Sequence, residues 1–303
     1  MELRQLRHFV MVVDTGNLSR AAERVAISQP ALTRSIKNLE ESLGVELLER
    51  KPRGVVPTEA GVTLYHHAKM VLNDCNRLTT DVRAFQRGLS GTVHVGIAAM
   101  FSSHIIDSVA TILSKEHPGV SMVISQGFFE ELVRELVDGR LDLIFSNFPP
   151  AAMPADVTVE PLYSVVSSIV VGNGHPLFKR REVDKSELVD LRWVVADQPH
   201  AKEFLEQFFS KDGLPTPLAV VRTNSLGLMI SLLSSGQFIT AVPAHLLARE
   251  FAAGSVRRLP LHDGSVERKA GLIYRVGGVE RKSVQLFLAE VRTVCASLPT
   301  TAR

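Results

Sequence analysis

One side of the segment 29–43 carries side chains that can form hydrogen bonds to nucleic-acid bases and phosphates. Its apolar residues recur at helical spacing and must face a core: Leu32, Ile36, Leu39 and Leu43. The opposite side then presents Gln29, Thr33, Arg34 and Lys37. Gln and Arg can make paired hydrogen bonds to base edges, while Thr and Lys suit phosphates or bases. We therefore expect this face to contact base pairs in the major groove of double-stranded DNA.

Two helices joined by a tight turn would hold this face. Asn17 is the expected N-cap of a first helix over 17–25, and Ser28 or Gln29 that of the second. Pro30 falls in the first turn of the second helix, where its missing N–H costs nothing, and we include it among the DNA contacts. The pattern predicts a helix-turn-helix with its polar side exposed. The alternative is an ordinary amphipathic helix pair whose charged side is merely solvated.

A basic projection follows the helix pair. The segment 50–58 contains Arg50, Lys51 and Arg53 and no acidic residue. Its two prolines and one glycine disfavour a helix, so we expect a hairpin-like wing. Such a wing suits contacts from Arg50 and Arg53 to the phosphate backbone or an adjacent minor groove. The alternative is a solvated charged loop.

Several runs within residues 1–65 share the pattern of a known family. They are Leu3, Leu6 and Phe9, the Arg20-Ala21-Ala22 step, Ser28 to Arg34, Leu39 to Gly44, Leu47 to Arg50, and Thr58 to Gly61. In these runs the segment resembles the N-terminal domain of LysR-type transcriptional regulators, and the whole chain has that family's length and layout. The departures are Val25, Thr33, Leu48 and Pro57. Thr33 keeps the hydroxyl of the usual serine, whereas Pro57 stiffens the exit of the wing.

Composition limits the classes of protein that fit. The 303 residues carry a net charge of only +2, so DNA affinity must come from local patches. Aromatic residues make up 6%, which disfavours a surface that stacks single-stranded bases. The two cysteines, Cys75 and Cys295, have no metal-ligand spacing, and we expect no metal or other cofactor. The N-terminus lacks an apolar signal core and no stretch suits a bilayer span, so the expected location is the cytoplasm, away from membranes.

A long helix is predicted from Thr58 to about residue 87. Its apolar residues follow alternating steps of four and three: Leu64, Ala68, Val71, Cys75, Leu78, Val82 and Phe85. Such a heptad seam is typical of a helix that pairs with its copy in a homodimer, which would let two recognition helices contact an inverted repeat. The alternative is packing of the seam on the chain's own C-terminal part. The family resemblance further implies a homotetramer built from two kinds of dimer.

From residue 92 onwards the patterns of strands and helices alternate, which predicts a mostly parallel sheet. Prolines at 149, 150, 154 and 161 mark a break, after which a second series begins with a strand over 165–171. We expect a winged helix-turn-helix domain at 1–58 and a linker helix at 59–88. An α/β effector-binding domain would occupy 92–303, with subdomain I at about 92–161 and 266–303 and subdomain II at about 162–265. The two Rossmann-like subdomains would enclose a cleft, as in periplasmic binding proteins, and the resemblance implies the same arrangement.

Two segments at expected strand ends suit a small anion, because hydroxyls and free N–H groups gather there. In subdomain I we select Met100, Phe101, Ser102 and Ser103, and in subdomain II Thr223 and Asn224. Phe128 and Phe148 would add an apolar wall. The phenylalanines could equally be plain core, and Ser102 and Thr223 simple N-caps.

The function predicted from these features is a sequence-specific DNA-binding regulator of transcription that responds to a small-molecule effector, expected to be a small organic anion. An alternative is a cytoplasmic solute-binding module without a DNA role. An enzyme is disfavoured, because the sequence contains no nucleophile elbow, phosphate-binding loop or zinc-type His/Glu spacing. The run Gly172-Asn173-Gly174-His175-Pro176 is not a dinucleotide motif, since the proline interrupts the helix that such a motif must open.

Overall fold

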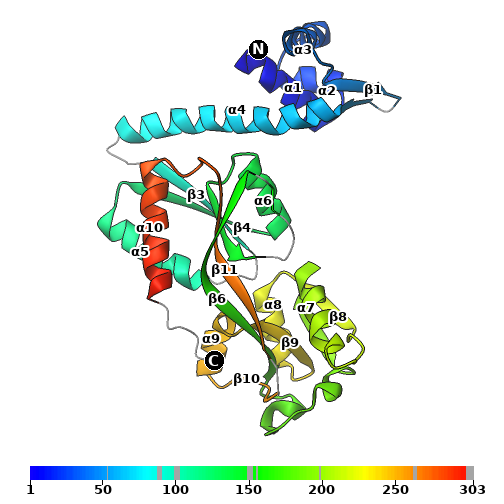
Figure 1. Ribbon diagram of the computed structural model, residues 1–303, viewed down its shortest axis with the longest axis vertical. Helices are drawn as coiled ribbons and strands as arrows, with labels where there is room; N and C mark the ends of the chain where they lie inside the picture. Colours follow the sequence, from blue (N-terminus) through cyan, green and yellow to red (C-terminus); the bar gives the residue numbers. More distant parts are fainter. Residues whose placement is uncertain are drawn as a thin grey trace.

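The computed structural model describes residues 1–52, 54–86, 91–98, 103–148, 153–154, 156–197, 199–261 and 265–297. A small N-terminal unit lies at one end of the long helix α4, and a two-part α/β domain lies on the other side of that helix (Figure 1). Among the described residues, no helix has the length and apolar character needed to cross a lipid bilayer.

The N-terminal unit is a winged helix-turn-helix, as predicted. It contains the helices α1 (Leu3–Thr15), α2 (Leu18–Arg24) and α3 (Gln29–Leu43) and a hairpin of β1 (Leu48–Lys51) and β2 (Gly54–Pro57). The Asn17 side chain accepts a hydrogen bond from the Arg20 N–H, and Ser28 caps α3 in the same way through the Ala31 N–H. Phe9, Leu32 and Leu39 form a fully buried core between the helices.

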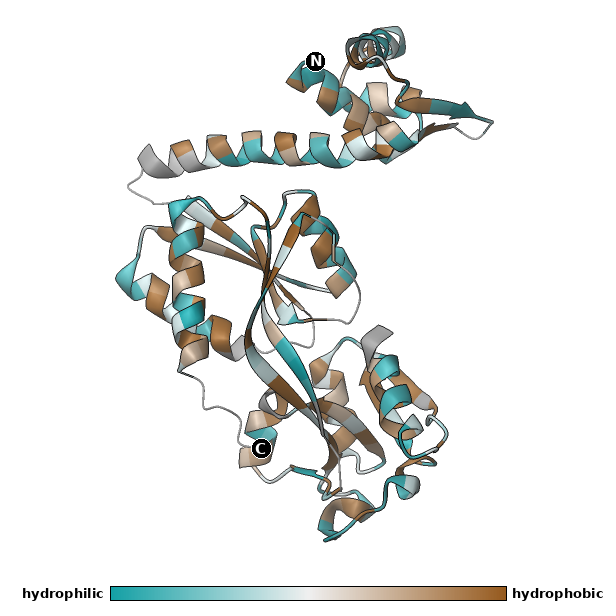
Figure 2. Cartoon of the chain, in the orientation of Figure 1, coloured by the Kyte–Doolittle hydropathy of each residue, from teal (hydrophilic) through white to brown (hydrophobic). Residues whose placement is uncertain are grey.

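Helix α4 (Glu59–Gln86) carries the predicted heptad seam. Near its start, Leu64 and Ala68 pack on the core of the N-terminal unit. Farther along, the side chains of Val71, Leu78 and Val82 are 42%, 65% and 53% exposed. Figure 2 shows hydrophobic and hydrophilic residues alternating along this helix. These three seam residues therefore do not pack on the chain's own C-terminal domain, which was the alternative to a dimer.

Subdomain I is built on three parallel strands: β4 (Val120–Gly127), β3 (Gly91–Ala98) and β5 (Leu143–Asn147). Its helices are α5 (Ser103–Glu116), α6 (Phe129–Val137) and α10 (Lys282–Ala296). The strands β3 and β5 are short, mostly buried runs that helices cover on both faces, whereas the edge strand β4 is largely exposed. The C-terminal helix α10 returns to this subdomain, as expected, and its Phe287 is fully buried against the core of β3 and α5.

Subdomain II contains the parallel strands β9 (Phe238–Pro243), β7 (Arg192–Ala196) and β8 (Ala219–Thr223). The short strand β10 (Val256–Arg258) pairs with β6. Helices α7 (Pro199–Ser210), α8 (Leu226–Ser234) and α9 (Ala248–Ala252) accompany them, with 3₁₀ turns at Pro176–Lys179, Lys185–Leu188 and Ala244–Leu247. Trp193 is fully buried at the centre and donates its indole N–H to the Leu188 carbonyl at 2.9 Å.

Two long antiparallel strands, β6 (Val157–Gly172) and β11 (Ser265–Arg275), join the subdomains into one sheet of order β4-β3-β5-β11-β6-β9-β7-β8. The sheet is thus more mixed than predicted, since β11 runs antiparallel to β5 and β6 antiparallel to β9. The strand expected to begin at 165 begins at Val157, and Pro161 lies inside it rather than at a break. The strand tolerates this proline at a β-bulge opposite Ala270 and Gly271.

An ion pair fastens this bulge to α10. The Glu160 carboxylate accepts hydrogen bonds from Arg292 Nε at 2.7 Å, Arg292 Nη2 at 2.8 Å and the Tyr274 hydroxyl at 3.0 Å. The two hydrogen bonds from Arg292 lower the pKa of Glu160, partial burial raises it, and the bond from Tyr274 adds to the lowering. A carboxyl with a lowered pKa stabilises the fold above its unfolded pKa, and this contribution disappears as the pH falls through the folded value.

We expect Glu160→Gln to reduce the free energy of unfolding by about 1 kcal/mol at pH 7, a modest value because Arg292 is half exposed. The difference from the unsubstituted protein should shrink toward zero as the pH falls through the lowered folded pKa of Glu160 and the carboxylate becomes protonated. Urea unfolding at pH 7 and at a series of acidic pH values measures this. A difference that stays constant with pH would contradict the role given to the carboxylate.

Candidate DNA-binding surface and effector cleft

The polar face predicted to contact DNA is open in the structure. Gln29, Pro30, Arg34 and Lys37 are exposed, and Thr33 is half-buried beside them. Helix α3 lies on the side of α4 that faces away from the α/β domain (Figure 1). The face is therefore not covered by the chain's own C-terminal part, and a duplex can approach it.

Neighbouring side chains fix the position of this face. The Gln29 side-chain oxygen accepts a hydrogen bond from the Ser19 hydroxyl at 3.1 Å, which leaves its amide N–H groups available to bases. Lys37 lies 3.7 Å from Glu41 in an exposed pair. Behind the face, His8 Nδ1 lies 2.8 Å from the Ser35 hydroxyl and links α1 to α3. Burial lowers the pKa of His8, as do the nearby charges of Arg4 and Arg7, so this link joins neutral groups near pH 7.

The predicted wing is the β1–β2 hairpin. Arg50 is exposed on β1, where it pairs with Val55 across the hairpin. Arg53, the other predicted contact of the wing, lies outside the described residues. The Val55 N–H donates to the Gly16 carbonyl at 2.9 Å, which anchors the wing to the end of α1. This approach requires a glycine at position 54, whose φ is +138° and where a Cβ would lie 2.3 Å from the Gly16 oxygen.

A cleft lies between the two subdomains, at the carboxyl ends of parallel strands where ligands collect in open α/β sheets. Ala98 ends β3, Asn147 ends β5, and Val195 and Ala196 end β7. The cleft holds about 640 Å³ of empty space, part of it open to solvent. Its other lining residues come from the crossover strands, β9 and its following turn, and α7: Ser167, Arg268, Ala241, Val242, Pro243, Leu246, Ala201, Phe204 and Leu205.

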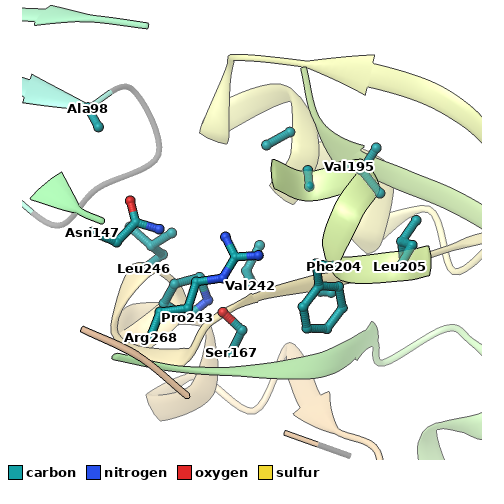
Figure 3. A pocket seen from close by; sticks show the side chains of 13 residues that line it. Ala98, Asn147, Ser167, Val195, Phe204, Leu205, Val242, Pro243, Leu246 and Arg268 are labelled. Carbon is teal, nitrogen blue, oxygen red and sulfur yellow. The ribbon is translucent and has the colours of Figure 1, made fainter. Parts of the chain in front are cut away.

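Arg268 is the cation of this lining. Figure 3 shows its guanidinium group projecting into the space between Asn147 and Phe204, with Ser167 nearby. Burial lowers the pKa of Arg268 and the carboxylate of Glu203 opposes that shift, but an arginine stays charged in either case. A partly desolvated guanidinium beside an amide and a hydroxyl can hold a carboxylate by two parallel hydrogen bonds. The apolar part of the lining then suits the body of a small organic molecule.

The effector residues selected from the sequence lie either away from the described cleft lining or outside the described residues. Met100, Phe101 and Ser102 are not among the described residues, and Ser103 is described only as the first residue of α5. The described lining includes none of the other four selected residues. Phe148 packs on the core around Phe129, and Phe128 is the first backbone acceptor of α6. Thr223 accepts a hydrogen bond from the Ser225 N–H at 3.0 Å, and Asn224 is exposed beside it.

Reasoning from sequence missed Asn147, Ser167 and Arg268. Asn147 follows directly after an apolar run that was assigned to a strand, and a polar residue at that point was the available signal. Ser167 and Arg268 lie within the crossover strands and carry no local signal, because only the pairing of β6 with β11 brings them to the cleft.

One cluster of possible metal ligands occurs among the described residues. Ligand atoms of Glu116, His117 and Glu290 lie within 4.8 Å of one another where α5 ends beside α10. Glu116 is exposed, and the cluster lies away from the cleft lining. Exposed acidic groups commonly gather in this way without a metal ion.

Two family models match most of the chain. The helix-turn-helix model of the LysR family of bacterial regulatory proteins matches residues 3–62, and the LysR substrate-binding domain matches residues 86–296. The chain belongs to the LysR family. The resemblance inferred from residues 1–65 is thereby confirmed. Because the members of this family are transcriptional regulators, the chain is a DNA-binding regulator with an effector-binding domain and not an enzyme.

Relatives extend this match over nearly the whole regulator. This chain is 31% identical to the HTH-type transcriptional regulator GalR of Pseudomonas putida over 97% of this chain and 74% of the relative. It is 25% identical to the DNA-binding transcriptional dual regulator OxyR of Escherichia coli over 96% of this chain and 95% of the relative.

Solved structures share the fold. A full-length OxyR variant from Pseudomonas aeruginosa gives a TM-score of 0.67 at 23% identity, covering 100% of this chain and 99% of that chain. The structure of full-length CbnR in complex with its target DNA gives a TM-score of 0.65 at 22% identity, covering 97% of this chain and 100% of that chain.

The anchoring of the wing can be tested at two glycines. We expect Gly54→Ala to cost at least about 2 kcal/mol of unfolding free energy, because its Cβ would collide with the Gly16 carbonyl. Gly44→Ala is the matched control, since its φ is +71° but no atom lies within 4 Å of the added Cβ. The control should cost only about 1 kcal/mol, the strain of the left-handed backbone. Urea unfolding of the two variants compares the losses, and equal losses would contradict the close contact between wing and α1.

Proposed function

We propose that this regulator binds double-stranded DNA through α3 and its wing, and that a small organic anion held between the two subdomains controls this binding. Gln29, Thr33 and Arg34 would contact bases. Pro30 would lie against them, and Lys37, Arg50 and Arg53 would contact phosphates or the minor groove. The observation that carries this proposal is the open polar face of α3, which lies away from a separate cleft that contains Arg268.

A homodimer through α4 fits the exposed half of the heptad seam, since Val71, Leu78 and Val82 are 42%, 65% and 53% exposed. Two regulators paired in this way would present two recognition helices to an inverted repeat. Family resemblance adds a homotetramer to this proposal. A solute-binding module without a DNA role is not favoured, because the family match includes the helix-turn-helix at residues 3–62.

Some relatives have names that refer to hydrogen peroxide, such as the hydrogen peroxide-inducible genes activator of Pectobacterium carotovorum, to which this chain is 26% identical. Cys295 is buried in the core of subdomain I, and burial raises the pKa of its thiol to about 11. The reactive form of a thiol is the thiolate, which is scarce near pH 7 at such a pKa. Cys75 lies on α4, away from the cleft. These positions favour a bound organic anion over thiol oxidation as the signal.

The DNA contacts can be tested without knowledge of the natural operator. A duplex that the regulator selects from a random-sequence library serves as the probe. We expect Arg34→Ala to lose roughly 10- to 100-fold in affinity for this duplex and to accept more base changes at one position of each half-site. Arg249→Ala, which removes an exposed arginine from α9, is the control and should bind normally. Unchanged affinity and unchanged base preference in Arg34→Ala would contradict the proposed contact.

The effector proposal can be tested by thermal unfolding in the presence of a panel of small carboxylic acids. We expect at least one acid to raise the unfolding temperature, and Arg268→Met to weaken its binding by roughly tenfold or more, because a charge-assisted hydrogen-bonded pair is lost. Arg222→Met is the matched control, since Arg222 lies on β8 outside the described lining and pairs with Asp197. Stabilisation by neutral analogues alone, or an unaffected Arg268→Met, would contradict an anionic effector at this position.

A further inference from the structure

Two buried carboxylates of subdomain I lie directly against the linker helix. Asp138 follows α6, and Asp142 precedes β5. Their side chains are only 7% and 1% exposed. A buried carboxylate costs free energy unless it is paired. The groups that surround these two acids therefore determine how strongly subdomain I holds α4.

Four polar residues of α4 supply partners to this region: Lys69, Asn73 and Arg77, which are spaced four apart, and His66, whose Nδ1 lies 3.5 Å from Asp138. Lys69 Nζ lies 2.6 Å from Asp138, and Arg77 Nη1 lies 2.5 Å from Asp142. Between them, Asn73 Nδ2 donates to the Asp138 backbone carbonyl at 2.7 Å. Residues four apart share one face of a helix, so this stripe is distinct from the heptad seam. The described contact between α4 and subdomain I thus rests largely on charge and hydrogen bonds.

Both acids also have partners inside subdomain I. Arg281 lies 2.5 Å from Asp142, which in addition accepts the His94 backbone N–H at 2.8 Å. Arg140 lies 3.6 Å from Asp138. The acids therefore stay paired if α4 moves away, and the effector domain does not depend on the linker helix for its internal electrostatics.

Some buried donors at this contact have no hydrogen-bond partner among the described residues. They include Arg77 Nη2 and Arg275 Nε. Buried N–H groups without acceptors lose the hydrogen bonds that water would give them. Separation of α4 from subdomain I would hydrate these donors, which offsets part of the loss of the two ion pairs. The polar contact therefore holds α4 to subdomain I less firmly than apolar packing holds the start of α4 to the winged helix-turn-helix, where Leu64 and Ala68 pack on the core.

We propose that Lys69 and Arg77, with Asp138 and Asp142, form a releasable ionic joint that sets the direction of the DNA-binding part relative to the effector domain. The winged helix-turn-helix and the first half of α4 move as one apolar-packed body, and the joint is the place where that body is fixed or freed. With the joint formed, α3 is held at one angle to the effector domain. With the joint open, this angle varies while both domains keep their folds.

Pulsed electron paramagnetic resonance can measure this angle as a distance distribution. Spin labels are attached to cysteines introduced at the exposed positions Glu23 on α2 and Asp107 on α5, in a chain with Cys75→Ala. Cys295 is left in place because its burial protects it from the label. Labelled protein is mixed with an excess of unlabelled protein so that distances between subunits do not contribute.

We expect one narrow distance peak for the otherwise unsubstituted chain and a broad or doubled distribution for Lys69→Met/Arg77→Met. Lys202→Met/Arg249→Met removes the same charge from exposed sites in subdomain II and should keep the narrow peak. Arg77→Lys retains the cation and should keep it as well. If the double variant fails to fold, the single variants replace it and should each give an intermediate width. A narrow peak at an unchanged distance in the double variant, or a broad distribution in the otherwise unsubstituted chain, would overturn the joint.

Discussion

The antiparallel pairing of β6 with β11 is the constraint on which the effector domain depends. These two strands are shared by both subdomains, and their register runs from Val157 opposite Arg275 to Ser168 opposite Ser265. Every other strand of the large sheet is joined to one of them, either directly or through one or two intervening strands. The bulge at Gly271 bends the pair, and only glycine fits there because a Cβ would lie 2.1 Å from the Glu160 carbonyl. A change in the relative position of the two subdomains would therefore have to act through this pair.

The same pair explains how the cleft obtains its chemistry. Arg268 and Ser167 lie on the crossover strands, while Asn147 and Val195 approach from the two separate subdomains. A ligand that contacts all of them favours one relative position of the subdomains, since only differential contacts can shift such an equilibrium. At the far side of subdomain I, the proposed joint with α4 would connect that position to the DNA-binding part. Each of the two parts is held together by apolar packing, whereas the contact between them is polar. This difference permits one part to move relative to the other as a rigid unit.

The sequence predicted local structure well where short-range chemistry dominates. Asn17, Ser28 and Pro30 located the start of the helices, because caps and proline act within one turn. The heptad spacing predicted a helix that extends to Gln86 with an exposed apolar seam. Pro161 misled the placement of β6, because tertiary pairing across a bulge tolerates a proline that local preference would put in a break.

The cleft and the ionic contact could not be predicted in the same way. Arg268 and Asn147 are more than a hundred residues apart in the sequence and come together only through strand order. Likewise, nothing near Lys69 or Arg77 indicates that Asp138 and Asp142 will lie beneath them. Charge patterns on a helix predict a solvated face unless the packing partner is known. The polar face of α3 was easier to predict from the sequence, because a face that stays exposed to solvent depends on no tertiary partner.

The central claim is that the cleft and the DNA-contacting face are energetically coupled. Thermodynamic linkage requires such coupling to be reciprocal. The most direct measurement is a titration of a stabilising carboxylic acid into the regulator with and without its selected DNA duplex, together with DNA binding with and without saturating acid. The account predicts that the affinity for the acid changes on DNA binding by the same factor as the affinity for DNA changes on acid binding. Identical acid affinities in the free and DNA-bound regulator, with unchanged DNA affinity and footprint, would contradict it.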